Sequence, residues 1–295
     1  MFHDNESGHS GVPASSKAFV DRRRLRYYYR LAASTVQYLT HTEVHTFAFS
    51  VAANAILSFF PFVLLLMTLS QRVFRSATMS RVINDLLGDN LPAGREFVIR
   101  NLSAMAAARS KPQFASLLIL LITSTGVFLP LEVALNRVWR FPSNRSYLGN
   151  QLIALALAFA SGILALLSIA LSAGNLFLLR MLALGHDLVL FRILAFVTDK
   201  VFATLASMAV FFLIYWLLPN GKVPARAVLP AAIITGLLSE ILKYSYILLL
   251  PRLDFQEVYG PFWISVSMMI WAFLTGLLLL AGAHLSAQKI FLKEE

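Results

Sequence analysis

The sequence lacks cysteine altogether, and it lacks the motifs of several enzyme classes. Without a thiol, the chain forms no disulfide, no thiolate metal site and no cysteine nucleophile. It contains no Gly-x-x-x-x-Gly-Lys-Ser/Thr phosphate loop, no His-Glu-x-x-His and no Gly-x-Ser-x-Gly. Its 15 acidic residues include no cluster suited to a two-metal nuclease. We therefore expect neither an enzyme nor an ATP-driven pump subunit acting by itself, and we expect no metal and no cofactor.

Apolar residues dominate what is present. They make up 58% of the 295 residues, with a mean hydropathy of +0.70, whereas soluble domains typically contain about 45–50% apolar residues. The excess falls in blocks of roughly 20 residues, the length that crosses a hydrocarbon core about 30 Å thick. The pattern predicts an all-α polytopic membrane protein with about six transmembrane helices in one membrane domain.

The blocks define the predicted organisation of the chain. A polar cytoplasmic segment with a basic amphipathic helix covers 1–46, the six-span membrane domain covers 47–288, and a cytoplasmic tail covers 289–295. The spans are predicted at 47–69, 114–137, 147 to an exit at 172–175, 197–218, 227–250 and 261–285. Two short amphipathic helices are predicted within 71–112, and an interfacial connection at 176–194. Pro61 lies inside the first span and predicts a kink there.

Basic residues predict the orientation of the chain. The net charge is +10, which in a soluble protein would favour nucleic-acid binding. Here Lys and Arg flank apolar spans, where they fix orientation and contact anionic headgroups, so we expect no nucleic-acid partner. Those in the short connections fall mostly on the side of both termini, which predicts cytoplasmic termini. The basic interval 71–112 would lie outside, against this bias, unless it lies flat at the headgroup surface.

Two charges inside the fifth span are the strongest candidates for a site. Glu240 and Lys243 are three residues apart and therefore share one helical face. A lone charge at membrane depth costs about 2.5–3.5 kcal/mol on insertion scales, and pairing lessens that cost. One interpretation is a polar pocket for a substrate or a proton. The other is a structural ion pair that fixes helix packing, and the sequence leaves both open.

Four further polar residues lie within or at the ends of spans. Asn54 and Ser58 are four apart in the first span, and we expect their shared face inside the bundle. Glu132 lies near the end of the second span, where pairing with Arg137 or snorkelling is the simpler interpretation. His284 has no second ligand at metal spacing, so a structural role is the simpler interpretation. The candidate interior polar path comprises Glu240, Lys243, Asn54, Ser58, Glu132 and His284.

Four short motifs resemble the YihY/virulence factor BrkB family of bacterial inner-membrane proteins over about residues 40 to 288. They are Ala53-Asn54-Ala55-Ile56-Leu57-Ser58-Phe59-Phe60-Pro61, Ala134-Leu135-Asn136-Arg137-Val138-Trp139, Tyr215-Trp216-Leu217-Leu218-Pro219-Asn220 with Val223 and Arg226, and Val258-Tyr259-Gly260 with Trp271 and Gly282-Ala283-His284-Leu285. Two positions depart from the pattern. Asn54 stands where the family usually has an aromatic residue, and His284 where it usually has an acidic one.

The resemblance implies a six-span α-helical protein of the bacterial inner membrane. Export of lipid-like or other amphiphilic compounds is the activity suggested for such proteins. The family was also once designated as a ribonuclease, but this sequence shows no catalytic residues for that activity. The leading hypothesis is a transporter or flippase of an amphiphilic substrate, and the alternative is a non-transporting envelope scaffold. The expected partners are membrane lipids, that substrate and, in a homo-oligomer, a second copy of the chain.

Overall fold

The computed structural model describes residues 27, 29–68, 100, 127–142, 145–182 and 189–291. The long helices are α2 (Thr42–Thr68), α6 (Tyr147–Leu182), α7 (Val189–Leu217), α8 (Ala225–Leu249) and α10 (Trp263–Phe291). Residues 29–39 and 127–138 are also helical. Between α8 and α10 lie three short elements, η2 (Leu250–Arg252), α9 (Phe255–Tyr259) and η3 (Gly260–Phe262). The described part of the chain contains no strand.

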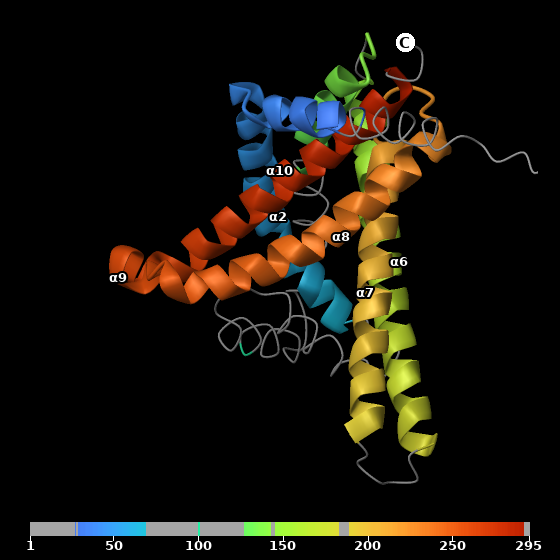
Figure 1. Ribbon diagram of the computed structural model, residues 1–295, viewed down its shortest axis with the longest axis vertical. Coiled ribbons are helices and arrows are strands. Elements are labelled where there is room, and N and C mark those ends of the chain that lie inside the picture. Colours follow the sequence, from blue (N-terminus) through green and yellow to red (C-terminus); the bar gives the residue numbers. More distant parts are fainter. Residues whose placement is uncertain are drawn as a thin grey trace, which may run out of the picture.

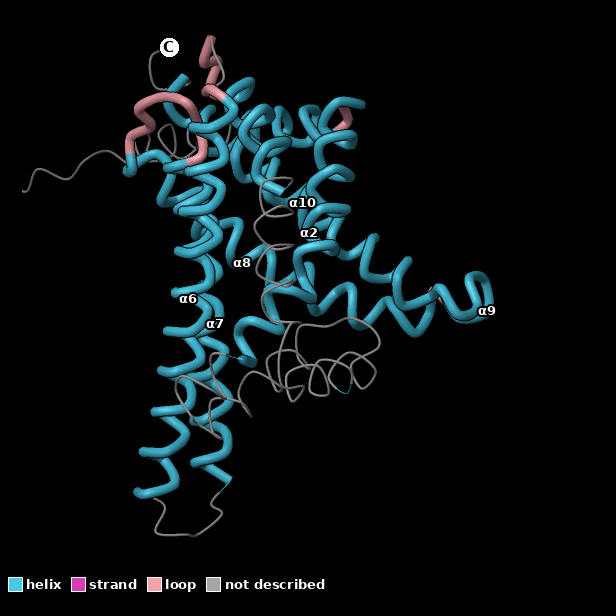
Figure 2. The backbone as a smooth tube through the Cα atoms, turned by 180° about the vertical axis from the view of Figure 1, so that it is seen from behind, coloured by secondary structure: helices cyan, strands magenta, loops and turns pink. Residues whose placement is uncertain are grey.

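The long helices pack in a series that differs from their order in the sequence. α6 packs on α7, α7 on α8, α8 on α10, and α10 on α2. Figure 1 shows α6 and α7 side by side along the long axis, with α8 and α10 running obliquely to them toward α9. The view from behind in Figure 2 shows the same two helical pairs meeting at one end of the molecule. The first long helix therefore lies beside the last one.

Continuous apolar sequence makes these helices, because a helix satisfies all of its backbone groups internally where no water is available. Two of these helices contain an internal proline, which removes one backbone hydrogen bond. Pro61 lies within α2, which continues through it to Thr68, and Pro230 lies within the second turn of α8. Membrane helices tolerate such prolines because neighbouring helices and local adjustments satisfy the freed carbonyl.

Four of the described helical segments are long and apolar enough to cross a membrane: Leu148–Ser168, Phe196–Leu217, Ala225–Arg252 and Phe255–Gln288. Large apolar side chains on them face outward, including Leu152 at 68% and Leu248 at 70% exposure. Such a surface suits lipid and not water. The predicted all-α membrane class is confirmed. The count of six spans stays a prediction, because most of the second predicted span lies outside the described residues.

The third and fourth predicted spans agree with two of the candidate membrane segments, Leu148–Ser168 and Phe196–Leu217. The helices extend beyond these segments, because α6 continues through Gly174 to Leu182 and α7 begins at Val189. The described part of the predicted connection at 176–194 is therefore helical. Gly and Asn favour a helix end only weakly, and packing overrides such a preference. Here α6 and α7 lie against each other along their lengths. Apart from Arg100, the residues of the predicted amphipathic helices at 71–112 lie outside the described residues.

Candidate functional site

Two adjoining hollows lie between the long helices. The first, of about 330 Å³, is bounded by α2, the helix at 127–138, α6, α7 and α10. The second, of about 320 Å³, is bounded by α6, α7, α8 and α10. The two hollows share four lining residues, which are Ser161, Val210, Trp271 and Thr275. We name the two hollows together the interhelical cavity.

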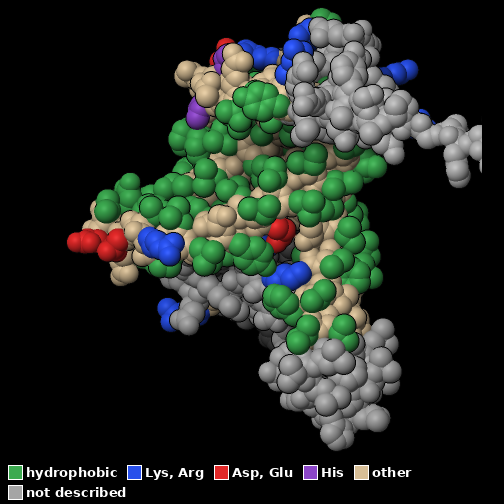
Figure 3. Space-filling model, viewed as in Figure 1, with side chains coloured by type: hydrophobic (Ala, Val, Ile, Leu, Met, Phe, Trp, Pro, Cys, Tyr) green, Lys and Arg blue, Asp and Glu red, His purple; other side chains and the backbone are tan. Residues whose placement is uncertain are grey.

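The two halves of the interhelical cavity differ in polarity. The first hollow is lined almost entirely by apolar side chains, such as Ile56, Phe128 and Ile214. The second adds the hydroxyl groups of Ser207 and Ser239 and the charges of Glu240 and Lys243. Figure 3 shows acidic and basic side chains in a hollow on an otherwise largely apolar face. The cavity therefore has an apolar end and a charged end, which is the division that an amphiphile has.

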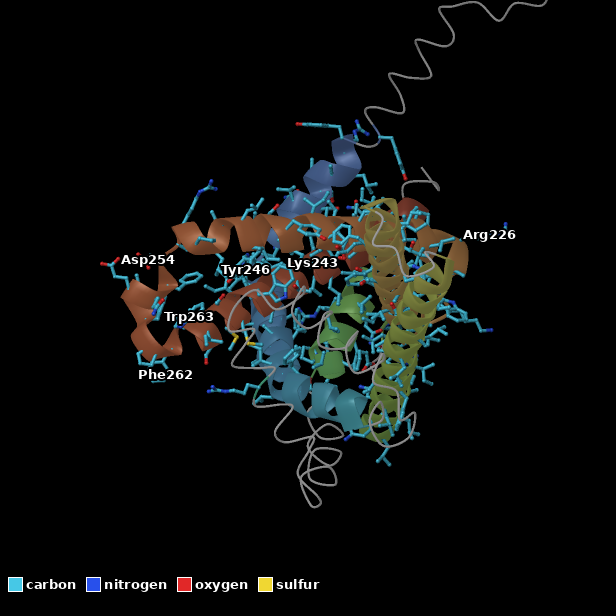
Figure 4. All side chains as sticks on the ribbon, turned by 90° about the horizontal axis from the view of Figure 1, so that it is seen from below. Arg226, Lys243, Tyr246, Asp254, Phe262 and Trp263 are labelled. Carbon is cyan, nitrogen blue, oxygen red and sulfur yellow. The ribbon has the colours of Figure 1, made fainter. Side chains whose placement is uncertain are left out.

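The charged end is built by a single helix. On α8 the Lys243 Nζ lies 2.6 Å from the Glu240 carboxylate, with the two side chains 7% and 22% exposed. The spacing of three residues makes this contact within the helix, since such positions are neighbours on its surface. Lys243 Nζ also lies 5.2 Å from the centre of the Tyr244 ring. Figure 4 shows Lys243 and Tyr246 toward the middle of the molecule and Arg226 at its margin.

An aromatic wall adjoins the charged end. Tyr246 on α8 donates a hydrogen bond to the Ser267 carbonyl at 2.8 Å, which ties α8 to α10. Its ring lies 5.3 Å from that of Trp271, one turn further along α10. Trp271 lines both hollows. Trp271 belongs to one of the family motifs, but its place at the cavity could not be predicted, because that place depends on which helices adjoin α10.

Asn54 and Ser58 are satisfied on their own helix. The Asn54 amide donates to the Ser50 carbonyl, and the Ser58 hydroxyl donates to the Asn54 carbonyl, both at 2.9 Å. Their neighbours Ala55 and Phe59 line the first hollow. The first span thus contributes an apolar wall, and its two polar side chains form local contacts along α2.

Glu132 is fully buried, away from Lys243, in a polar network at one end of the helices. Asn136 donates to its carboxylate at 3.3 Å and accepts from the backbone N–H of Asn220 at 2.7 Å. The Arg145 guanidinium donates to the carbonyls of Leu217, Leu218 and Pro219 at the end of α7. Arg137 pairs with Glu43 at the start of α2, and so the expected contact between Glu132 and Arg137 is not the one formed.

His284 joins the last helix to the first one described. Its ring stacks on Tyr38 with centroids 4.4 Å apart, and its Nδ1 lies 3.3 Å from the Thr35 hydroxyl. Gln288, one turn on, bonds Ser34. Burial raises the pKa of Tyr38, in the surface helix at 29–39, to about 12. The candidate path of the sequence is therefore divided, with Glu240 and Lys243 at the cavity and Glu132 and His284 in contacts at the helix ends.

Buried partners at the helix ends also hold the cavity's framework in place. Tyr215 on α7 is completely buried; its hydroxyl donates to the Leu279 carbonyl at 2.9 Å and lies within hydrogen-bond distance of the Thr235 hydroxyl, at 3.2 Å. Three helices thus meet at one phenol. The family motifs contain Tyr215 and Asn136, but sequence reasoning assigned no structural role to either of them or to Arg145, although a polar group within an apolar run signals a buried partner. Among the described residues, no group of three His, Asp or Glu could hold a metal ion.

The fold and the cavity define a polytopic α-helical membrane protein with an amphipathic interior. The chain belongs to the virulence factor BrkB family, whose model matches residues 35–290, which confirms the family predicted from the motifs. It is 26% identical over 255 residues to a UPF0761 membrane protein of Cronobacter sakazakii, covering 82% of each chain. It is 22% identical to a UPF0761 membrane protein of Pseudoalteromonas atlantica, covering 82% of this chain and 80% of that one. No solved structure matches the chain.

Proposed function

We propose that this protein transports a lipid-like or amphiphilic compound across or between the leaflets of the bacterial inner membrane. One observation carries the proposal: the interhelical cavity joins an apolar hollow to one that holds the Glu240–Lys243 pair. Ionisable residues within spans usually face a bundle interior or a wet cavity, and they often mark a substrate path. The chain would act without enzymatic chemistry and without a bound cofactor.

The depth of the charged end supports this proposal. Glu240 follows Ala225, the first residue of α8, by a helical rise of about 22 Å at 1.5 Å per residue. Since the hydrocarbon core is about 30 Å thick, a spanning α8 places the pair inside the bilayer and away from both headgroup layers. A polar group of a substrate would find a partner there that lipid chains do not provide. The pair thus lowers the barrier that a headgroup meets in hydrocarbon.

The placement of both termini in the cytoplasm belongs to the same proposal. The end of the helix at 127–138 contacts two other helix ends. It pairs with the start of α2 through Arg137 and Glu43, and it bonds the connection between α7 and α8 through Asn136 and Asn220. The C-terminal end of α10 joins them through His284 and Gln288. Lys222 and Arg226 lie at this junction, and basic connections remain on the cytoplasmic side. The first and last described helices therefore meet at the same end of the helix bundle as these basic residues.

Transport is tested by filling the cavity. The purified chain is reconstituted into liposomes with a trace of a fluorescent single-chain phospholipid, and a membrane-impermeant reductant reports how fast inner-leaflet probe reaches the outside. We expect the protein to accelerate this exchange. Ala165→Phe places a ring in the charged half of the cavity and should slow exchange about tenfold or more, because the ring occupies space that the substrate needs; a tenfold change corresponds to about 1.4 kcal/mol.

The matched control uses the same substitution on the same helix. Ala156 lies on the exposed face of α6, so Ala156→Phe should leave the exchange rate unchanged. Exchange no faster than in protein-free liposomes would overturn the transport proposal. It would favour the alternative, a non-transporting envelope scaffold, for which one observation speaks: Glu240 and Lys243 already satisfy each other within one helix.

A further inference from the structure

We infer that the connection between α8 and α10 anchors the protein in the lipid leaflet opposite the N-terminal end of α8. We name residues 253–263, which contain α9 and η3, the α9 tip. Its apolar side chains lie among the acyl chains of that leaflet, and its polar side chains lie among the headgroups. The inference goes beyond the proposed function, because it assigns a lipid-binding surface to the α9 tip and does not depend on transport.

Large apolar side chains of the α9 tip are exposed at the surface of the molecule. Val258 is 70%, Phe262 71% and Tyr259 43% exposed. Exposed apolar residues that are scattered singly need no explanation, but these three fall within one stretch of the chain, 258–262. Contact of such a stretch with water is unfavourable, because apolar surface is driven out of water. Acyl chains are the surroundings that suit it.

The sequence of α9 (Phe255–Tyr259) separates apolar from polar side chains. Phe255, Val258 and Tyr259 stand at positions i, i+3 and i+4, which share one face of a helix. The ring centres of Phe255 and Tyr259 lie 6.0 Å apart, as expected for neighbours on that face. Gln256 and Glu257 fall on the opposite face, because successive helical residues are rotated by about 100°. α9 is therefore amphipathic, which is the pattern of a helix that lies in a membrane interface.

The aromatic residues of the α9 tip include the two kinds that gather at membrane interfaces. Tyr259 and Trp263 each combine an apolar ring with a polar group, and for this reason Tyr and Trp are enriched where water meets lipid. A hollow of about 290 Å³ at the tip is lined by residues that include Phe255, Trp263, Asp254 and Gln256. Carboxylate and amide groups thus lie beside aromatic rings, as they do where headgroups meet acyl chains.

The length of α8 places the α9 tip at the level of a membrane interface. From Ala225 to Leu249 the helix rises about 36 Å at 1.5 Å per residue, which exceeds the hydrocarbon thickness of about 30 Å. Figures 1 and 2 both show the far ends of α6 and α7 extending beyond α9 along the long axis. Since α6 and α7 contain membrane-length segments, α9 lies at a level where lipid surrounds the helices.

The direction of the α9 tip also suits a lipid surface. Figure 4 looks along the long axis and shows Asp254 and Phe262 apart from each other at the two ends of the tip. The tip therefore runs across the axis that α6 and α7 follow. When α6 and α7 cross the membrane, a segment in this direction lies along the plane of the leaflet. Its apolar face then contacts acyl chains along its whole length, so we assign this surface to lipid and not to a soluble protein.

The test measures the surroundings of each face of α9 with a probe. The chain has no cysteine, and Val258→Cys and Gln256→Cys each introduce one thiol at an exposed position, on opposite faces of α9. Each variant is labelled with a nitroxide and reconstituted into liposomes of phosphatidylethanolamine and phosphatidylglycerol. Electron paramagnetic resonance compares collisions with oxygen, which dissolves in acyl chains, and with a nickel chelate, which stays in water. We expect the oxygen-to-nickel collision ratio to be about fivefold or more higher at residue 258 than at residue 256.

A carboxylate added to either face provides the matched control. In a chain labelled through Phe262→Cys, Val258→Asp should lower the collision ratio at residue 262 about twofold or more, because a charge on the apolar face draws the tip toward water. Gln256→Asp adds the same group to the polar face and should leave the ratio unchanged. Thermal unfolding midpoints identify a variant that fails to fold, and Tyr259→Asp then repeats the test on the apolar face.

The outcomes distinguish lipid from the other surroundings that the α9 tip could have. Equal collision ratios at residues 256 and 258 overturn the inference, because both faces then meet water. Low collision rates with both reagents at residue 258 also overturn it, because protein then covers the apolar face; a dependence on the protein-to-lipid ratio would identify a second copy of the chain. A high ratio at residue 258 with a low ratio at residue 256 supports the inference. Lipid exchange is a separate measurement, so transport and the anchor can each fail while the other stands.

Discussion

At the scale of single residues, the structure pairs its buried charges in two different ways. Lys243 has its counter-charge one turn away on the same helix, and Glu132 has an amide and a backbone N–H as partners. The two arrangements differ in what a ligand can reach. The Glu240–Lys243 pair lines a cavity and can contact a ligand there, whereas the Glu132 carboxylate is buried in a network of protein hydrogen bonds.

The pair predicts a coupled response to mutation. Lys243→Met or Glu240→Gln alone should lower the free energy of unfolding in detergent by about 3–5 kcal/mol, because each removes the opposite charge that the remaining side chain contacts at 2.6 Å. The double variant should return to within about 1 kcal/mol of the original chain, as pairs replaced together often do. Chemical denaturation of the original protein, the two single variants and the double variant gives a double-mutant cycle. Additive losses would show that the two side chains do not interact.

At the scale of helices, close approach depends on small residues at crossings. A Cβ atom on Gly282 of α10 would lie 2.0 Å from the Thr235 hydroxyl and 2.3 Å from the Tyr215 hydroxyl. Such distances force a shift in the junction that Tyr215 makes between α7, α8 and α10. Gly276, two turns earlier, lies against the backbone of Ala48 in α2, with 3.2 Å between the position of its Cβ and the Ala48 oxygen.

One methyl group at this junction should therefore be costly. Gly282→Ala should destabilise the fold by about 1–3 kcal/mol, the usual cost of overpacking a well-packed site. Gly174 in α6 is the matched control, since a Cβ there meets nothing within 4 Å. Gly174→Ala should be neutral or stabilising by about 0.5–1 kcal/mol, the difference between the two residues in a helix. Thermal unfolding in detergent compares them, and equal midpoints would contradict the crowding at Gly282.

The helices also show what sequence can predict. Apolar length placed the fifth and sixth spans within a few residues of α8 and α10, because membrane thickness fixes that length. It also placed the third and fourth spans close to the segments Leu148–Ser168 and Phe196–Leu217, but it did not show that α6 continues through Gly174 and Asn175 to Leu182. The Glu240–Lys243 pair was predictable from spacing along one helix. Trp271 at the cavity was not, because it depends on the crossing of four helices.

At the scale of the whole molecule, the helix ends separate into two groups. Lys222 precedes α8 and Gln256 follows it, so a spanning α8 places them on opposite sides of the membrane. Figure 4 shows the corresponding ends apart, with Arg226 at one side and Asp254 at the other. The basic residues near Lys222 assign that side to the cytoplasm under the proposed orientation.

The absence of cysteine makes this orientation directly measurable. Lys222→Cys and Gln256→Cys each introduce a single thiol into a chain that has none. In intact cells with a permeable outer membrane, a membrane-impermeant maleimide should label Gln256→Cys and leave Lys222→Cys unlabelled until the inner membrane is opened. Both sites lie in exposed connections, so unmodified folding is expected. Labelling of both sites in intact cells would contradict a membrane-spanning α8, and the reverse pattern would invert the proposed orientation.

The contact of Glu240 with Lys243 within one helix also bears on how the protein is made. A segment that carries both charges of a pair brings the counter-charge with it when it leaves the insertion machinery, so this contact does not depend on a helix that is still being synthesised. α8 emerges before α10, and it therefore enters lipid with its counter-charge already in place. The contact between Glu240 and Lys243 can thus form before α10 packs against α8.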